Sequence, residues 1–256
     1  MTEVLAKSSS RYVGDDYANR HPDWHVGDAP LKADDLVPAT LAVARAVGKP
    51  VISAADVGGG VGGVMKEIRD RLNSAMPQTT FKPVIYEFAS AAVAMGQSMF
   101  PDIEFRQKLL DGTDGPHDVI YLVDVLEHLE DPWSLLRSCH SVAPYLIVRQ
   151  PLLDNFARFH HNDYKIQRDD WGHIAFFNAR SFNDMLAACG WAPFSAKLIA
   201  PWELTGVDKE KFAWLRLKKM LIQYNRPIMS FFVDGFYNVG AYARRTDNQT
   251  NGQVNA

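Results

Sequence analysis

The chain has 256 residues and a formal net charge of −3 at pH 7, with 47% hydrophobic and 22% charged residues. This composition is ordinary for a globular protein and excludes an extensive basic surface, so nucleic acid is not expected as a partner. The sequence has no run of the roughly 18 apolar residues that a membrane-spanning helix needs, and its first residues lack the plan of a signal peptide. Together with only two cysteines, which lie far apart in sequence, these features predict a cytoplasmic protein that does not bind a membrane.

Apolar runs alternate with helix-forming segments through the first 150 residues, after a polar and aromatic N-terminal stretch. The predicted helices cover residues 32–47, 62–75, 89–98, 132–142, 181–189 and 208–224. The predicted strands cover residues 51–57, 83–87, 103–110, 118–123, 145–148, 191–199 and 236–244. Strands that alternate with helices indicate βαβ units. The sequence therefore predicts an α/β fold, Rossmann-like and doubly wound, with a mostly parallel seven-stranded sheet and a terminal antiparallel strand.

Three segments are predicted along the chain: an arm over residues 1–36, one domain over 37–245, and a disordered tail over 246–256, where apolar residues are few. The arm would fold over the ligand as a lid, or pack on the outside of the domain. Its aromatic and histidine side chains are Tyr12, Tyr17, Trp24 and His25. Segments inserted late in the chain, residues 152–180 and 203–235, would complete the lid and the pocket.

A glycine-rich turn joins the first strand to a helix, since residues 55–63 read Ala-Asp-Val-Gly-Gly-Gly-Val-Gly-Gly. Glycine tolerates positive φ and lets a ligand approach the backbone, and the following helix directs unpaired N–H groups at that ligand. Gly58, Gly60 and Gly63 also satisfy the dinucleotide pattern G-x-G-x-x-G. Asp56 argues against a nicotinamide dehydrogenase, because dinucleotide sites normally keep an apolar residue there, and an acid would face the ligand instead.

At these residues the chain resembles the class I S-adenosylmethionine-dependent methyltransferases. Their first motif, an acid followed by glycines at alternate positions, is matched by Asp56, Gly58, Gly60 and Gly62. Residues 118–132 read Asp-Val-Ile-Tyr-Leu-Val-Asp-Val-Leu-Glu-His-Leu-Glu-Asp-Pro, which is similar to the Asp-Val-Leu-Glu-His motif of a small-molecule methyltransferase branch. Gly-His-Ile-Ala-Phe-Phe at 172–177 looks like the same branch. The resemblance covers about residues 28–200.

The resemblance implies S-adenosylmethionine as the cofactor and a position for each part of it. The implied cofactor-binding residues are Asp56, Gly58, Gly60, Gly62, Glu87, Asp111 and Asp124. The glycine turn would receive the methionine end, Glu87 the two ribose hydroxyls, and Asp111 the adenine amine. Asp124 would face the ligand or cap the next helix.

The acceptor side of the site is expected to hold a general base, either His128 or His173, since histidine has a pKa suited to proton removal. Substrate contacts are expected from Arg149, Gln150, Asn155 and Tyr17. Arg149 would hold an acidic acceptor in a bidentate contact, unless it forms an ion pair within the protein. No metal is expected, because the histidines over residues 160–173 are not spaced as in a zinc site.

The function that the resemblance implies is methyl transfer from S-adenosylmethionine to a small-molecule acceptor, such as a sugar or a secondary metabolite. Two alternatives stay open. One is other chemistry at the sulfonium, by cyclisation or aminocarboxypropyl transfer with release of methylthioadenosine. The other is a protein that binds S-adenosylmethionine without catalysis. The expected partner is a small-molecule substrate, and a homodimer is compatible with the sequence.

Overall fold

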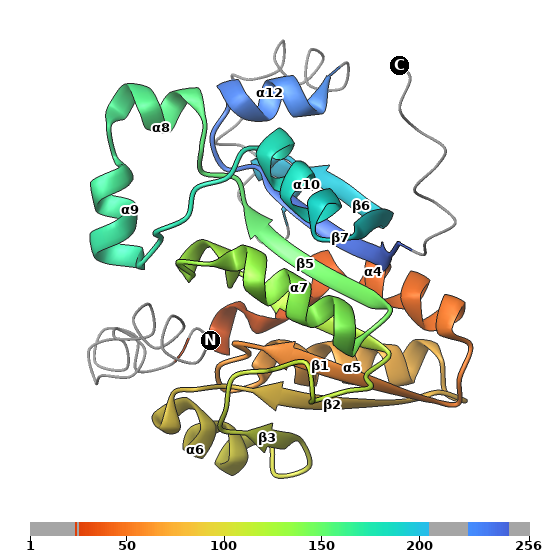
Figure 1. Ribbon diagram of the computed structural model, residues 1–256. Coiled ribbons are helices and arrows are strands. Elements are labelled where there is room, and N and C mark those ends of the chain that lie inside the picture. Colours follow the sequence, from red (N-terminus) through yellow and green to blue (C-terminus); the bar gives the residue numbers. More distant parts are fainter. Residues whose placement is uncertain (1–23, 25, 205–224, 246–256) are drawn as a thin grey trace.

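The computed structural model describes residues 24, 26–204 and 225–245. These residues form one seven-stranded sheet in the order β3-β2-β1-β4-β5-β7-β6 (Figure 1). The strands are β1 Val51–Val57, β2 Thr80–Tyr86, β3 Glu104–Arg106, β4 Val119–Val123, β5 Tyr145–Pro151, β6 Trp191–Ile199 and β7 Tyr237–Arg244. Strands β1 to β5 pair in parallel, whereas β7 runs antiparallel to both of its neighbours, β5 and β6.

Helices cover both faces of this sheet (Figure 1). The helices are η1 Val26–Asp28, α4 Ala29–Val47, α5 Gly63–Ala75, α6 Ser90–Met99, η2 Leu126–His128, α7 Pro132–Val142, α8 Phe156–His161, α9 Tyr164–Trp171, α10 Ala179–Ala188, η3 Pro201–Glu203 and α12 Arg226–Phe232. Because side chains alternate along a strand, β1 packs Ile52 into the core under α4 and α5, and Ala55 into the core under α7 and α10. The predicted doubly wound fold, with its terminal antiparallel strand, is confirmed.

The third strand is shorter than the sequence analysis predicts. It covers Glu104–Arg106 rather than residues 103–110. The residues that follow form a turn in which Asp111 Oδ1 accepts the N–H of Thr113 and Asp114 Oδ2 accepts the N–H of Asp111, both at 2.8 Å. Directly after the strand, the carbonyl oxygen of Arg106 accepts the N–H of Lys108 at 2.9 Å and turns the chain. The aspartate side chains then bind nearby backbone N–H groups, which competes with sheet pairing.

Residues 152–172 contain two helices that the sequence analysis does not identify, α8 and α9. Asn155 begins α8 by accepting the N–H of Arg158 at 3.0 Å, and Gly172 ends α9 with a φ of 76°. Asparagine and glycine are common at such boundaries. The helices are only six and eight residues long, however, which is too short for an amphipathic period to stand out in the sequence.

Several predicted features lie outside the described residues. They are Tyr12, Tyr17 and His25 of the arm, the helix over residues 208–224, and the tail over residues 246–256. Residues 29–36, which the sequence analysis assigns to the arm, form the first turns of α4. In the described parts of the chain, no helix is both long enough and apolar enough to cross a bilayer.

Candidate functional site

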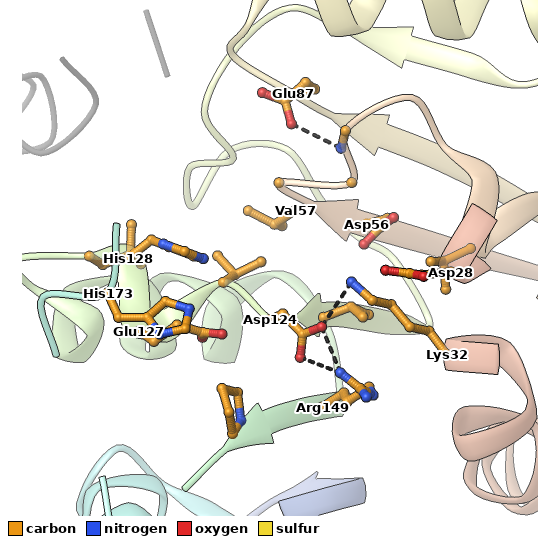
Figure 2. A pocket seen from close by; sticks show the side chains of 18 of the residues that line it. Asp28, Lys32, Asp56, Val57, Glu87, Asp124, Glu127, His128, Arg149 and His173 are labelled. Carbon is orange, nitrogen blue, oxygen red and sulfur yellow. Dashed lines mark hydrogen bonds and ion pairs between the residues drawn. The ribbon is translucent and has the colours of Figure 1, made fainter. Parts of the chain in front are cut away.

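A cavity of about 820 Å³ opens where the parallel strands β1, β2, β4 and β5 end. The carboxyl ends of these strands supply polar side chains, and η1, the start of α4, and α9 supply further walls. Open α/β sheets bind ligands at this edge, where the strand order reverses. Figure 2 shows the arrangement: Glu87 lies at one end, His128, His173 and Glu127 gather on one side, and Asp124, Lys32 and Arg149 lie across from them.

The glycine turn after β1 forms one wall of this cavity. Gly60 has a φ of 56°, and no described atom lies within 4 Å of where a Cβ would stand, so its backbone faces the cavity directly. Gly58 also lines the cavity. Gly62 does not: it precedes α5, and a Cβ there would lie 3.0 Å from the ring of Phe105. The structure therefore gives Gly62 a packing role.

Asp56, at the end of β1, is 2% exposed. Burial raises the pKa of this carboxyl to about 7, and the nearby charge of Glu87 adds to the effect, whereas Lys32 opposes it. Its Oδ1 atom has no hydrogen-bond partner among the described residues. A buried acceptor in this state is costly unless a ligand satisfies it, and a cationic donor would do so best.

Glu87 follows β2 directly and ties that strand to the glycine turn. Its Oε2 accepts the N–H of Gly60 at 2.9 Å, and its Oε1 accepts the N–H groups of Phe88 and Ala89 at 2.6 and 2.8 Å. Burial raises the pKa of Glu87, while these backbone bonds oppose the rise. Since a carboxylate offers about four acceptor positions, roughly one remains for a ligand hydroxyl.

Asp124 follows β4 in a left-handed conformation, with a φ of 55°. Arg149 Nη1 donates to both of its oxygens at 2.8 and 2.7 Å, and Lys32 Nζ lies 2.9 Å from Oδ2. Although burial opposes ionisation, Arg149 and Lys32 lower the pKa of Asp124 to about 2. The guanidinium of Arg149 also lies 4.1 Å from the ring centroid of Tyr237 and 3.4 Å from Asp35.

This network changes the interpretation of two residues. Arg149 forms the ion pair within the protein that the sequence analysis gives as the alternative to an acceptor contact. Asp124 caps neither following helix: η2 begins after Val125 without a side-chain cap, and Asp131 accepts the N–H of Ser134 at the start of α7. Lys32 is a residue that the sequence analysis misses, since nothing in the pattern of its helix distinguishes it from a solvent-exposed lysine.

Glu127 and two histidines form a second cluster in the cavity. Glu127 is 1% exposed, and burial together with the charge of Asp124 raises the pKa of its carboxyl to about 8. The rings of His128 and His173 lie 4.9 Å apart. His173 reaches this position because the carbonyl oxygen of Glu127 accepts the N–H groups of Ile174 and Ala175 at 2.8 and 3.0 Å.

Both imidazoles are oriented by carbonyl oxygens. His128 Nδ1 lies 3.1 Å from the carbonyl oxygen of Gly172, and His173 Nδ1 lies 3.0 Å from Oε1 of Gln167. Burial lowers the pKa of His128, and burial with the neighbouring ring of His128 lowers the pKa of His173 to about 4. Both rings are therefore neutral at pH 7, which is the protonation state of a base, but their low basicity weakens them in that role.

The structure does not bring all the predicted site residues together. Asp111 lines no part of the cavity, and its side chain faces Thr113 and Lys108 in an exposed turn. Gln150 and Asn155 are both 1% exposed and do not line the cavity either. Gln150 donates to the carbonyl oxygen of Pro151, and Asn155 caps α8. Tyr17 lies outside the described residues.

Three kinds of comparison relate this chain to known proteins. A family model described as a methyltransferase domain matches residues 30–196. No curated protein matches the chain with significant sequence similarity. Similar solved structures include a plantazolicin methyltransferase in complex with a monoazolic desmethyl-plantazolicin analogue and S-adenosylhomocysteine. That structure has a TM-score of 0.60 and 12% identity, and the match covers 94% of this chain and 95% of that one.

Two further solved structures share the fold. Magnesium protoporphyrin IX methyltransferase from Synechocystis, with S-adenosylhomocysteine bound, has a TM-score of 0.52 and 13% identity over 82% of this chain and 81% of that one. A [4+2]-cyclase has a TM-score of 0.53 and 12% identity over 81% and 80%. At such identities the likeness concerns the fold alone. The family model, however, spans well over half of the chain, so the chain belongs to the methyltransferase-domain family, and its resemblance to the class I S-adenosylmethionine-dependent methyltransferases is confirmed.

Proposed function

We propose that this protein transfers the methyl group of S-adenosylmethionine to a small molecule that binds in the same cavity, releasing S-adenosylhomocysteine. The observation that carries the proposal is the pair of buried carboxylates, Asp56 and Glu87, on either side of the open backbone at Gly60. S-Adenosylmethionine presents an ammonium and a ribose diol, two groups that donate hydrogen bonds to carboxylates. Structural neighbours with S-adenosylhomocysteine bound support the choice of cofactor.

The methionine end would lie at the glycine turn. Its ammonium would donate to the unpartnered Oδ1 of Asp56, and the positive charge would return that carboxyl to its ionised form. One ribose hydroxyl would donate to the remaining acceptor position of Glu87. We assign the adenine to the apolar wall formed by Phe88, Leu109 and Leu110, in place of the contact with Asp111 that the sequence resemblance implies.

The acceptor would enter from the side of the cavity formed by α8, α9, the start of β7 and the segment after β5, where Arg158, Gln167, Trp171, Tyr237 and Leu153 line the wall. A volume of about 820 Å³ lies within the range of small-molecule sites, and the cofactor would fill part of it. This favours a small acceptor over a macromolecule. Neighbours named for a porphyrin and for a plantazolicin precursor act on acceptors of different size, so the acceptor itself is left to experiment.

Methyl transfer of this kind is an in-line displacement in which the positive charge of the sulfonium disperses. Proximity and alignment supply most of the acceleration, on the order of 7–11 kcal/mol for well-oriented partners. The protein therefore has to position the two substrates and exclude water, while His128 or His173 accepts or directs the acceptor proton. The weak basicity of both rings fits an acceptor whose proton is already acidic.

A second candidate function is chemistry other than methyl transfer on the same fold, and the structural likeness to a [4+2]-cyclase supports keeping it. Incubation of the protein with S-adenosylmethionine, followed by mass-resolved product analysis with and without candidate acceptors, separates the hypotheses. S-Adenosylhomocysteine indicates methyl transfer, and methylthioadenosine indicates cyclisation or aminocarboxypropyl transfer. Cofactor binding without either product indicates a non-catalytic protein. The cytoplasmic location, the homodimer and the segment boundaries stay predictions.

A further inference from the structure

The cluster of Glu127, His128 and His173 has features that general-base chemistry does not require. One potential metal-ligating atom of each residue lies within 4.8 Å of the others. The three side chains come from η2 and from the segment after α9, and all three line the cavity (Figure 2). The backbone of Glu127 holds that segment in place through Ile174 and Ala175, so the cluster is part of the folded architecture.

The carboxylate of Glu127 is the first sign of a missing ligand. It is 1% exposed, and neither of its oxygens has a partner within hydrogen-bond distance among the described residues, although the amide of Gln150 lies near enough to favour its ionised form. Buried polar groups are normally paired, and an unpaired carboxylate in a folded protein needs an explanation. Lys32 and Arg149, two cationic side chains of the cavity, are engaged with Asp124 instead. A bound cation would satisfy Glu127.

The orientation of the two imidazoles is the second sign. The Nδ1 atoms of His128 and His173 face carbonyl oxygens, of Gly172 and of the Gln167 side chain. A carbonyl oxygen can only accept a hydrogen bond, so each Nδ1 carries the proton and each Nε2 carries the lone pair. Histidines that bind metals are held in this way, with the non-ligating N–H donated to an oxygen. Burial lowers the pKa of both rings, which keeps them in the neutral form that a metal needs.

We propose that Glu127, His128 and His173 bind one divalent transition-metal ion, with a carboxylate oxygen and the two Nε2 atoms as ligands. One carboxylate and two imidazoles suit Zn²⁺, Mn²⁺, Fe²⁺ or Co²⁺, whereas Ca²⁺ and Mg²⁺ prefer oxygen ligands alone. Ligands at the usual 2.0–2.2 Å from such an ion lie about 3–3.5 Å from one another, so the side chains move together by about 1 Å on binding. The sequence pattern gives no hint of this site, because Glu127 and His128 are adjacent and His173 lies far along the chain.

Three protein ligands leave at least one coordination position open to the cavity. That position would take an oxygen of the acceptor, and the ion would make a bound hydroxyl more acidic. With both Nε2 atoms bound to the ion, neither histidine acts as the base, and the ion replaces them in that role. The hydroxyl proton passes to solvent before methyl transfer, the oxygen then forms its bond to the methyl carbon, and the bond from that carbon to sulfur breaks. This catalytic role of the ion rests on the proposed function, and the acceptor class that it requires is an oxygen nucleophile. Binding of the ion itself does not depend on it.

The test uses the full-length, untagged protein after treatment with a chelator. Zn²⁺ is titrated by calorimetry, and Co²⁺ by its visible absorption bands. We expect one ion per chain. We also expect Glu127→Gln and His173→Asn to weaken binding by more than 100-fold, and Gln167→Leu, which removes the oxygen that orients His173, to weaken it by about 10–100-fold. The control replaces His160 and His161, exposed histidines of α8 outside the cluster, by asparagine and should bind like the parent.

The proposal is overturned if the parent protein shows no saturable binding of either ion, or if the Glu127 and His173 variants bind as the parent does. The parent titration decides the question even if a variant fails to fold. S-Adenosylmethionine affinity is measured separately in the same preparations. Cofactor binding without metal binding overturns this inference and leaves the proposed function in place. Metal binding without cofactor binding supports this inference and overturns the proposed function.

Discussion

The two ends of the cavity are held together by different forces. Around Gly60 and Glu87, backbone N–H groups satisfy the key carboxylate, and neighbouring parallel strands fix the geometry. Around Asp124, a half-buried carboxylate holds two cations, Lys32 and Arg149, that come from helix α4 and strand β5. The first end depends on local backbone geometry and the second on side chains that meet only after folding. Substitutions should therefore affect ligand binding at the first end and global stability at the second.

The largest effect should come from breaking the ion network. In Arg149→Met, the half-buried carboxylate of Asp124 loses its bidentate partner and keeps only Lys32. We expect the free energy of unfolding to fall by about 3–5 kcal/mol, as measured by urea denaturation. The matched control is Lys165→Met, which breaks the exposed pair with Asp169 on α9 and should change stability by less than about 1 kcal/mol. Equal losses in the two variants would show that burial of the network adds nothing.

Asp56 should give a pH-dependent effect of intermediate size. Its pKa is about 7 in the folded chain because of burial and Glu87, with Lys32 opposing, against an ordinary value of 3.8. The folded state therefore holds this proton more tightly, and the protein loses stability as the pH rises from about 4 to 7. In Asp56→Asn this loss is absent. Relative to the parent, the variant should gain about 2–3 kcal/mol between pH 5 and pH 8.

The measurement for Asp56 is urea denaturation of the parent and the variant across that pH range, without cofactor. A stability difference that does not change with pH would contradict the raised pKa. In addition, S-adenosylmethionine should bind the parent with release of a proton near pH 6, because its ammonium favours the ionised carboxylate. Calorimetry in two buffers with different ionisation enthalpies detects that proton.

Glu87→Gln tests the end of the cavity at the glycine turn, where Glu87 is expected to bind the ribose. The variant keeps the size of the side chain, but it loses the negative charge, and one acceptor oxygen becomes an NH2 donor that cannot accept the N–H of Gly60 or a ribose hydroxyl. Affinity for S-adenosylmethionine should fall by about 1.5–3 kcal/mol, with a smaller change in stability than for Arg149→Met. Glu104→Gln, on the neighbouring strand β3 and exposed, serves as the control. Unchanged affinity in a folded Glu87→Gln protein would reject the ribose assignment.

The smallest effect is expected at Asp111. The structure places this side chain in an exposed turn outside the cavity, so Asp111→Ala should change cofactor affinity by less than about 0.5 kcal/mol. Calorimetric titration with S-adenosylmethionine measures it. A loss of tenfold or more would mean that the loop after β3 closes on the bound cofactor, as the sequence resemblance implies.

The sequence predicted the position of those side chains that directly follow a strand. The acid and the glycine turn follow one strand directly, and Glu87 follows the next strand, so their placement at the same sheet edge comes from the parallel topology. The carboxyl ends of β1 and β2 are hydrogen-bonded neighbours in the sheet. The order of helices and strands was predictable for the same reason, since each element carries its own periodicity.

The sequence did not predict the contacts of side chains whose positions depend on elements far apart in the chain. Lys32 reaches Asp124 only because of the way α4 packs on the sheet, and the resulting network engages Arg149 internally. Glu127 is part of the Asp-Val-Leu-Glu-His motif, yet nothing in the motif says that its carboxylate is buried near the charge of Asp124. Asp111 was expected beside the adenine on the assumption that β3 continues to residue 110, whereas the strand ends at Arg106 and Asp111 lies in an exposed turn outside the cavity.

The ion pair between Lys32 and Asp124 has a consequence for protein engineering. Lys32 lies in the first turn of α4, so this contact anchors the beginning of the helix beside the end of β4. Trp24 and Val26, which come just before the helix, also line the cavity. A deletion that starts the protein at Ala29 would therefore remove part of one wall of the cavity while leaving every strand of the sheet in place.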